Sequence, residues 1–99
     1  MNKMVLNPVD SRKSFYGKAY AEREGDGVVV CYSYDTPVAA CVDGKIYRLW
    51  DRYSATTMRH VDAFADYFAG VRMGKREWDS LEVVTLADVR KAMREIAAA

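Results

Sequence analysis

The strongest strand signal in this 99-residue chain is Val28-Val29-Val30-Cys31-Tyr32-Ser33-Tyr34, which combines three β-branched residues with two tyrosines. Turn residues bound it on both sides, with Glu24-Gly25-Asp26-Gly27 before it and Asp35-Thr36-Pro37 after it. The chain is expected to reverse at residues 35–37, because an aspartate can hydrogen-bond the backbone ahead of it and the proline biases the residue before it away from the helical region. The stretch therefore predicts a strand between two reversals.

Three more strands are predicted around this one. Residues 15–23 contain aromatic residues in an alternating pattern, and residues 38–42 and 45–50 are mainly apolar or aromatic. The last two are joined by Asp43-Gly44, a two-residue hairpin signal, because both positions of such a turn need positive φ. Residues 15–50 are thus predicted to form a four-stranded antiparallel β-meander.

The turns also predict the register of the sheet. A three-residue loop at residues 35–37 places Cys31 opposite Cys41, and a two-residue loop at residues 43–44 places Cys41 opposite Ile46. One face is then predicted to carry Val30, Tyr32, Tyr34, Val38, Ala40, Val42, Tyr47 and Leu49. The other is predicted to carry Val29, Cys31, Ser33, Ala39, Cys41, Ile46, Arg48 and Trp50. Both faces are apolar enough to need cover, which is unusual for an antiparallel sheet.

The second half of the chain has helical patterns. Ser54 is the predicted N-cap of a helix from Ala55 to about Ala69, which Gly70 ends. A short helical turn is predicted over residues 75–81, and Thr85 caps a last helix. The apolar stripes of the two long helices are Met58, Val61, Ala65 and Phe68, and Leu86, Val89, Met93 and Ile96.

The predicted fold is α+β: a four-stranded antiparallel β-meander followed by two main helices, plus the short helical turn, packed on one face. We expect a single domain over residues 1–99, with the meander at 15–50 and the helical part at 54–98. Residues 1–10 contain Pro8 and show no clear period, so they are predicted to be a mobile or edge-attached arm.

The charge of the chain is nearly balanced, with a formal net charge of +1 from 15 basic and 14 acidic residues. A strong non-specific nucleic-acid binder usually has a basic excess, and a mimic of DNA usually has an acidic one. No apolar run approaches the ~20 residues of a membrane span, and the N-terminus lacks a secretory signal pattern. We therefore expect a cytoplasmic protein with no membrane partner.

Metal and cofactor sites are not predicted. Cys31 and Cys41 are the only cysteines, and His60 is the only histidine. These residues fall on strands and on a helix, without the close spacing of a metal-binding motif. Two buried thiols and one helix histidine are the simpler interpretation.

Hydroxyl groups cluster at the start of the first helix, where Ser54, Thr56 and Thr57 precede His60. A helix N-terminus with such hydroxyls, helped by Arg59 or Arg52, is suited to hold an anion such as a nucleotide phosphate. Helix capping explains the same residues without a ligand. Catalysis is a weaker interpretation, since neither a nucleophile elbow nor paired carboxylates are present, and no enzyme activity is predicted.

A nucleic-acid site is a second alternative. Arg12, Lys13 and Lys18 alternate with Phe15, Tyr16 and Tyr20, and such interleaving can bind single strands by charge and stacking. The competing interpretation is an edge strand protected by its basic residues.

A protein partner is a third alternative, because the chain holds seven tyrosines and two tryptophans. If the helices cover one face of the sheet, the other apolar face needs a partner. The candidates are a second copy of the chain, which gives a homodimer, a foreign protein, or the N-terminal arm.

Three segments carry a resemblance to a known group of proteins: Arg12-Lys13-Ser14-Phe15-Tyr16-Gly17-Lys18-Ala19, Ser33-Tyr34-Asp35-Thr36-Pro37-Val38-Ala39 and Tyr53-Ser54-Ala55-Thr56-Thr57-Met58-Arg59-His60. The chain resembles a family of small uncharacterised proteins of phages and prophages, from about Asp10 to Leu81. The resemblance implies a viral accessory protein of the bacterial host cytoplasm, without known catalytic residues. Short phage proteins of this kind often bind a host protein or ribonucleoprotein, as the inhibitors of CRISPR and other defence systems do.

We therefore expect a non-enzymatic protein that binds a host protein, with an anti-defence role of the anti-CRISPR type. The expected binding surface combines Arg12, Lys13, Tyr16 and Lys18 with Arg52, Arg59 and His60. It rests on the expectation that these two basic motifs converge in space.

Overall fold

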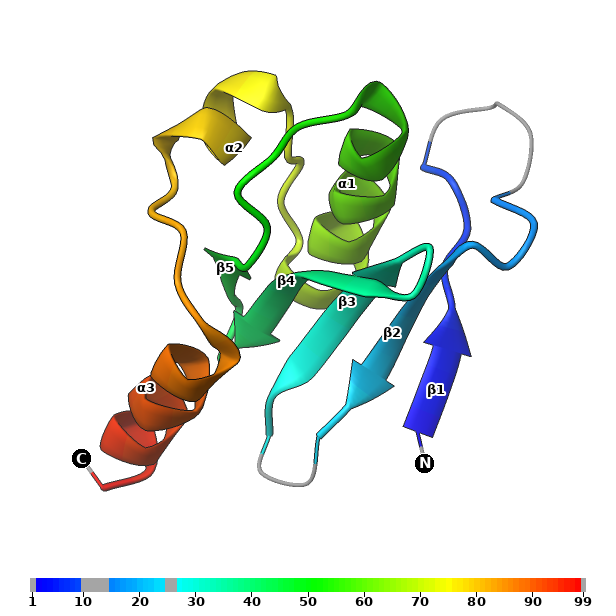
Figure 1. Cartoon of the computed structure of the whole chain (residues 1–99). Coiled ribbons are helices and arrows are strands. Elements are labelled where there is room, and N and C mark those ends of the chain that lie inside the picture. Colours follow the sequence, from blue (N-terminus) through cyan, green and yellow to red (C-terminus); the bar gives the residue numbers. More distant parts are fainter. Residues whose placement is uncertain (1, 10–14, 25–26, 99) are drawn as a thin grey trace.

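The computed structural model describes residues 2–9, 15–24 and 27–98. Its strands are β1 (Asn2–Val5), β2 (Ala19–Arg23), β3 (Val29–Ser33), β4 (Thr36–Val42) and β5 (Lys45–Arg48). Its helices are α1 (Ala55–Ala69), α2 (Lys75–Ser80) and α3 (Leu86–Ala98). Figure 1 shows the strands as one antiparallel sheet in the order of the sequence. The predicted α+β class is confirmed.

The described part of the sheet has five strands where the sequence predicted four. The extra strand, β1, comes from the N-terminal arm and pairs with β2, with Met4 opposite Ala21. The strand predicted from residue 15 begins at Ala19, because residues 15–18 form a tight turn in which the Lys18 N–H donates to the Phe15 carbonyl at 2.9 Å.

One of the two predicted hairpin registers is confirmed. Asp43 and Gly44 have φ of 51° and 78°, and Cys41 lies opposite Ile46 as expected. The other prediction is wrong: the β3–β4 turn consists of Tyr34 and Asp35, so Cys31 lies opposite Ala39 and not Cys41. A bulge follows at the next pair, where Tyr32 lies opposite Pro37 and leaves Val38 as the additional residue.

The error in register leaves most side chains on the face that was predicted, because a shift of two residues preserves the alternation. Two residues are exceptions. The bulged Val38 packs with Cys31 and Ala39, and the ring of Tyr34, which lies in the turn, is beside His60 of α1.

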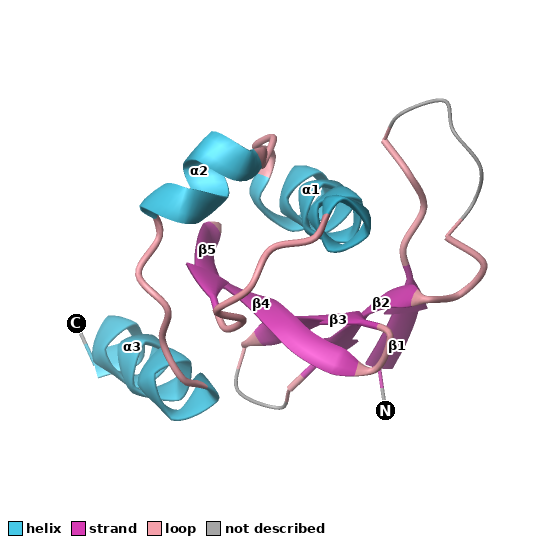
Figure 2. Cartoon of the chain, turned by 45° about the horizontal axis from the view of Figure 1, so that its top comes forward, coloured by secondary structure: helices cyan, strands magenta, loops and turns pink. Residues whose placement is uncertain are grey.

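The helices cover both faces of the sheet (Figure 2). α1 and α2 pack on the face that carries Cys31, Cys41 and Ile46, whereas α3 packs through Val89 on the opposite face. The prediction that the two main helices share one face is therefore wrong. The chain reaches the opposite face by passing along β5, where Val83 forms a parallel bridge with Arg48 and the Val84 N–H donates to the Arg48 carbonyl at 2.9 Å.

This arrangement also removes the reason for expecting a partner on an open sheet face. The second face carries Val28, Val30, Ala40 and Val42, and all four are buried beneath α3 and its neighbours. Among the described residues, no helix is long and apolar enough to cross a membrane.

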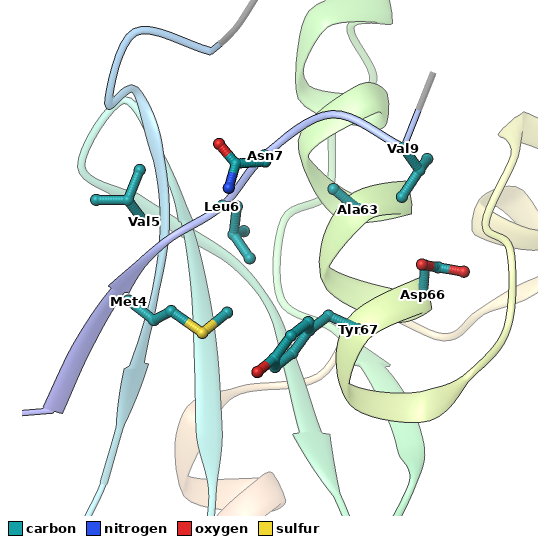
Figure 3. A pocket seen from close by; sticks show the side chains of 8 residues that line it. All are labelled: Met4, Val5, Leu6, Asn7, Val9, Ala63, Asp66 and Tyr67. Atoms are coloured by element: carbon teal, nitrogen blue, oxygen red, sulfur yellow. The ribbon is translucent and has the colours of Figure 1, made fainter. Parts of the chain in front are cut away.

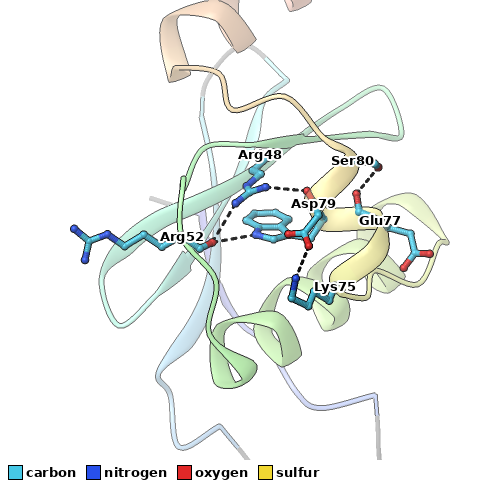
Figure 4. Close-up of polar contacts among 7 residues, drawn as sticks. Arg48, Arg52, Lys75, Glu77, Asp79 and Ser80 are labelled. Atoms are coloured by element: carbon cyan, nitrogen blue, oxygen red, sulfur yellow. Dashed lines mark hydrogen bonds and ion pairs between the residues drawn. The ribbon is translucent and has the colours of Figure 1, made fainter.

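A buried arginine connects β5 to α2 (Figure 4). The Arg48 guanidinium donates to the carbonyls of Trp50 at 2.7 Å, Trp78 at 3.0 Å and Arg52 at 3.3 Å, and it lies 4.7 Å from the Trp78 ring. The Trp78 indole N–H donates to the same Arg52 carbonyl at 3.2 Å. Arg48 is only 8% exposed, so the three carbonyls take the place of water as acceptors for its guanidinium. The same contacts hold the segment before α1 in place.

The predicted helix caps are confirmed. Ser54 Oγ accepts from the Thr57 N–H at 3.0 Å, and Gly70 ends α1 with φ of 66°. Thr85 and Asp88 exchange hydrogen bonds at the start of α3, as a capping box requires. These caps fix where α1 begins and therefore which of its side chains reach the end of β3.

Candidate functional site

The turn before β2, the β3–β4 turn and the start of α1 meet at one end of the sheet. They enclose a surface pocket of about 360 Å³, here named the Tyr16–Tyr34 pocket. It is lined by Phe15, Tyr16, Lys18, Tyr34, Thr56, Arg59 and His60. The Tyr34 N–H donates to the Lys18 carbonyl at 2.8 Å, so the two turns are held together by the backbone.

The rims of the pocket are two exposed tyrosines in an unusual backbone conformation. Tyr16 is 71% exposed with φ of 53°, and Tyr34 is 56% exposed with φ of 50°. Positive φ is uncommon for residues other than glycine, asparagine and aspartate, and for a bulky side chain it costs roughly 1–2 kcal/mol. Both turns therefore hold an aromatic ring at the surface at some expense of backbone strain.

His60 forms the floor of the pocket. Its side chain is 1% exposed, and its ring lies 4.5 Å from the Phe15 ring in an edge-to-face arrangement and 5.6 Å from the Tyr34 ring. The Arg59 guanidinium lies over the other part of the floor, 5.0 Å from the Phe15 ring. The histidine thus supports the aromatic side chains that reach the surface.

Beneath His60 lies a chain of buried hydroxyl groups. Ser33 Oγ lies 2.8 Å from His60 Nδ1 and 3.1 Å from Thr57 Oγ1, and all three residues are buried. Burial, and secondarily the Arg59 charge, lower the pKa of His60 from 6.5 to about 4. The imidazole is therefore neutral near pH 7, and its Nδ1 is hydrogen-bonded to the Ser33 hydroxyl.

This cluster has a nucleophile-type residue beside a histidine, but its geometry does not fit attack on a substrate. The Ser33 hydroxyl is buried between α1 and β3, whereas a nucleophile must reach the reacting atom. Among the described residues, no group of three or more histidine, cysteine, aspartate or glutamate side chains is placed to hold a metal ion. The arrangement is suited to hold α1 against the sheet.

The structure brings together half of the predicted site residues. Tyr16, Lys18, Thr56, Arg59 and His60 line the pocket, as the expected convergence of the two motifs requires. Arg12 and Lys13 lie outside the described residues.

The remaining described residues of the predicted site have contacts within the protein and do not line the pocket. Ser54 caps α1, and Thr57 is buried against Ser33, so of the three clustered hydroxyls only that of Thr56 lines the pocket. Arg52 contributes its carbonyl to the Arg48 cluster, and its side chain points away from that cluster (Figure 4).

Sequence reasoning missed Tyr34 and Ser33 as parts of the site. Strand alternation correctly placed Ser33 on the face that α1 covers, but it gave no relation between the strand and individual helix residues. Tyr34 was assigned to the sheet, because an aromatic residue in a two-residue turn has no sequence signature.

Comparison with known proteins gives a family. A family model of unknown function matches residues 4–80, which is most of the chain. The chain belongs to this family, DUF8033. No curated protein matches it, and no solved structure matches it.

The DUF8033 match includes every residue of the Tyr16–Tyr34 pocket and both helices of the α1 face. It ends at residue 80, before α3 begins at Leu86. The site therefore lies within the part of the chain that defines the family.

Proposed function

We propose that this chain is a non-enzymatic binding protein that engages a host protein through the Tyr16–Tyr34 pocket. The observation that carries the proposal is the pair of exposed tyrosines held at positive φ beside Lys18 and Arg59. Backbone strain persists where the surrounding structure enforces it, and it is concentrated at functional sites. Glycine would form the same turns without strain and asparagine with less strain, so turn formation alone does not explain the two rings.

The side chains of the pocket are those that dominate protein interfaces. Tyrosine and arginine are enriched among the residues that contribute most to binding, because they offer a large contact area with few rotatable bonds or several donors. Lys18 and Arg59 add positive charge to the lining of the pocket, and the neutral His60 adds none. The pocket therefore favours an acidic side chain of the partner that lies next to an apolar or aromatic one.

The resemblance to phage and prophage proteins extends this proposal to a biological role. The chain is proposed to be an accessory protein of a phage or mobile element that acts in the bacterial cytoplasm. The proposed host protein belongs to a defence complex, such as a CRISPR effector. A small domain that covers a functional surface of such a complex needs no catalytic centre of its own.

Affinity capture with matched variants tests this proposal. Wild-type protein, Tyr16→Ala/Tyr34→Ala and the control Tyr53→Ala, which removes an exposed tyrosine outside the pocket, are immobilised and exposed to host lysate. Captured proteins are quantified by mass spectrometry. We expect one host protein or complex to be retained by wild type and by the control and lost from the double variant. If no protein distinguishes the variants, the pocket is not a protein-binding surface.

Single-stranded nucleic acid is the second candidate, because exposed aromatic rings beside two cations also suit base stacking and phosphate contact. Gel-shift titration at several salt concentrations separates the two candidates, since phosphate contacts make affinity fall steeply with salt. Salt-sensitive binding that Tyr16→Ala/Tyr34→Ala abolishes would favour nucleic acid over the protein partner. The helix-start anion site is not proposed further, since Ser54 and Thr57 are engaged within the chain.

A further inference from the structure

Among the described residues, β1 is an edge strand that pairs with β2 alone. In Figure 1, β1 lies at the outer end of the sheet, with β2 on one side only. The opposite edge is partly closed, because Val83 and Val84 pair with Arg48 of β5. An open edge strand presents backbone donors and acceptors to any strand that can align with it.

The hydrogen bonds of β2 show which groups of β1 face outward. The Leu6 N–H donates to the Ala19 carbonyl at 3.0 Å, and bonded pairs alternate along an antiparallel ladder. The backbone N–H and C=O groups of Met4, two residues before Leu6, therefore also point towards β2. The N–H and C=O groups of Lys3 and Val5 point away from β2, and no described segment pairs with them.

Apolar side chains accompany this open edge. A groove of about 390 Å³ lies between the N-terminal segment and α1 and is lined in part by Met4, Val9, Ala63 and Tyr67 (Figure 3). Tyr67 is 66% exposed. Val5 also borders the groove and is 54% exposed, although the alternation of the strand turns its side chain away from that of Met4. These exposed apolar groups lie beside the backbone groups that a partner strand would engage.

We infer that β1 pairs with β1 of a second copy of this chain, antiparallel about a two-fold axis at Met4. The occupant is a second copy because the edge is complementary to itself. With Met4 opposite Met4 of the partner subunit, Lys3 faces Val5 of the partner subunit on both sides of the axis. The outward backbone groups of these residues then form reciprocal hydrogen-bonded pairs, as an isologous interface requires.

The side chains agree with this pairing. Met4 points to the α1 face, so the two methionines meet beside the groove, where the exposed Tyr67 of each copy covers them. Lys3 and Val5 lie on the opposite face, and each lysine faces a valine rather than another lysine, so like charges are not opposed. This interface is separate from the Tyr16–Tyr34 pocket and does not depend on the proposed function.

The pairing is tested first by removing one outward N–H. Sedimentation velocity over a wide range of concentration should show the wild-type mass rising from 11.2 kDa towards twice that value. Val5→Pro removes the outward N–H but no bond to β2, and proline is tolerated at such edge positions. It should remain at the monomer mass, whereas Val5→Thr, which keeps the N–H, should associate like wild type.

Cysteine cross-linking tests the register independently. Under mild oxidation, Met4→Cys should form a dimer on non-reducing gels, because directly opposed residues across the axis lie within disulfide reach. Lys3→Cys should not, since each Lys3 faces Val5 of the partner subunit. Circular dichroism confirms that the variants are folded. A wild type that stays monomeric at every concentration overturns the inference, as does dimerisation that persists in folded Val5→Pro or cross-linking of both cysteine variants alike.

Discussion

At the scale of single residues, His60 connects the pocket to the sheet. Its ring is in contact with Phe15 and Tyr34 above and is hydrogen-bonded to Ser33 below. Burial, and secondarily the charge of Arg59, disfavour protonation of the ring and lower its pKa. The folded protein therefore keeps this imidazole neutral until the pH falls to about 4.

The lowered pKa of His60 predicts acid sensitivity. The unfolded chain takes up a proton near pH 6.5 and the folded chain only near pH 4, so the unfolded state binds more protons between these values. The contribution to the free energy of unfolding is complete above pH 6.5 and is lost as the pH falls towards 4, by up to about 3 kcal/mol. Urea denaturation across this range measures it.

The control for this prediction is His60→Gln, which can hydrogen-bond Ser33 but does not titrate. The variant should lack the part of the pH dependence that lies between pH 4 and 6.5, although other groups still titrate in both proteins. NMR titration of the imidazole gives the pKa directly. A value near 6.5 in the folded protein would contradict this account of the site.

Arg48 is a second residue whose role depends on geometry. Its guanidinium donates in three directions to three carbonyls, which a single ammonium group cannot reproduce. Arg48→Lys should lower the free energy of unfolding by about 2–4 kcal/mol, because hydrogen bonds from charged groups contribute about 1.5–3 kcal/mol each. Chemical denaturation measures the change, and Arg52→Lys, with an exposed side chain, is the matched control. Equal stability of the two variants would show that the carbonyl contacts contribute little.

At the scale of elements, the strands and helices follow from local patterns, and the turns do so only in part. The sequence predicts the Asp43–Gly44 hairpin, because those residues adopt positive φ readily. It does not predict the Tyr34–Asp35 turn, in which an aromatic residue takes the same conformation. The packing of β3 and β4 decides the register there. The bulge at Val38 returns Ala39 and Cys41 to the face that the sequence predicted for them.

The burial of α3 against the sheet leads to a prediction for this helix. Val89 is fully buried between Val30, Val42 and their neighbours, whereas Ile96 on the same helix is exposed. Val89→Ala should lower the free energy of unfolding by about 2 kcal/mol, through lost burial and the cavity that remains. Ile96→Ala should change it by less than about 0.5 kcal/mol. Similar effects in urea titrations of the two variants would indicate that α3 is not docked on this face.

At the scale of the whole molecule, the sequence shows that both faces of the sheet need cover but not which helix covers which face. The apolar stripes of α1 and α3 are alike, so periodicity does not distinguish them. The chain passes beside Arg48 on its way to α3, and this path determines which face α3 covers. No local sequence pattern predicts the contact between residues 48 and 83. The sequence led us to expect that the segment of Tyr16 and Lys18 meets the start of α1. It did not predict that Tyr34 lies between them, because that contact is also distant in sequence.

The central claim is that Tyr16 and Tyr34 occupy strained turns in order to bind a partner. Tyr16→Asn/Tyr34→Asn tests it most directly, because asparagine adopts positive φ readily but lacks the ring. Urea denaturation and capture from host lysate are measured on the same protein. We expect the free energy of unfolding to be maintained or to rise by up to about 2 kcal/mol, while the captured host protein is lost. A variant that is strongly destabilised, or that retains the captured protein at the wild-type level, would contradict the claim.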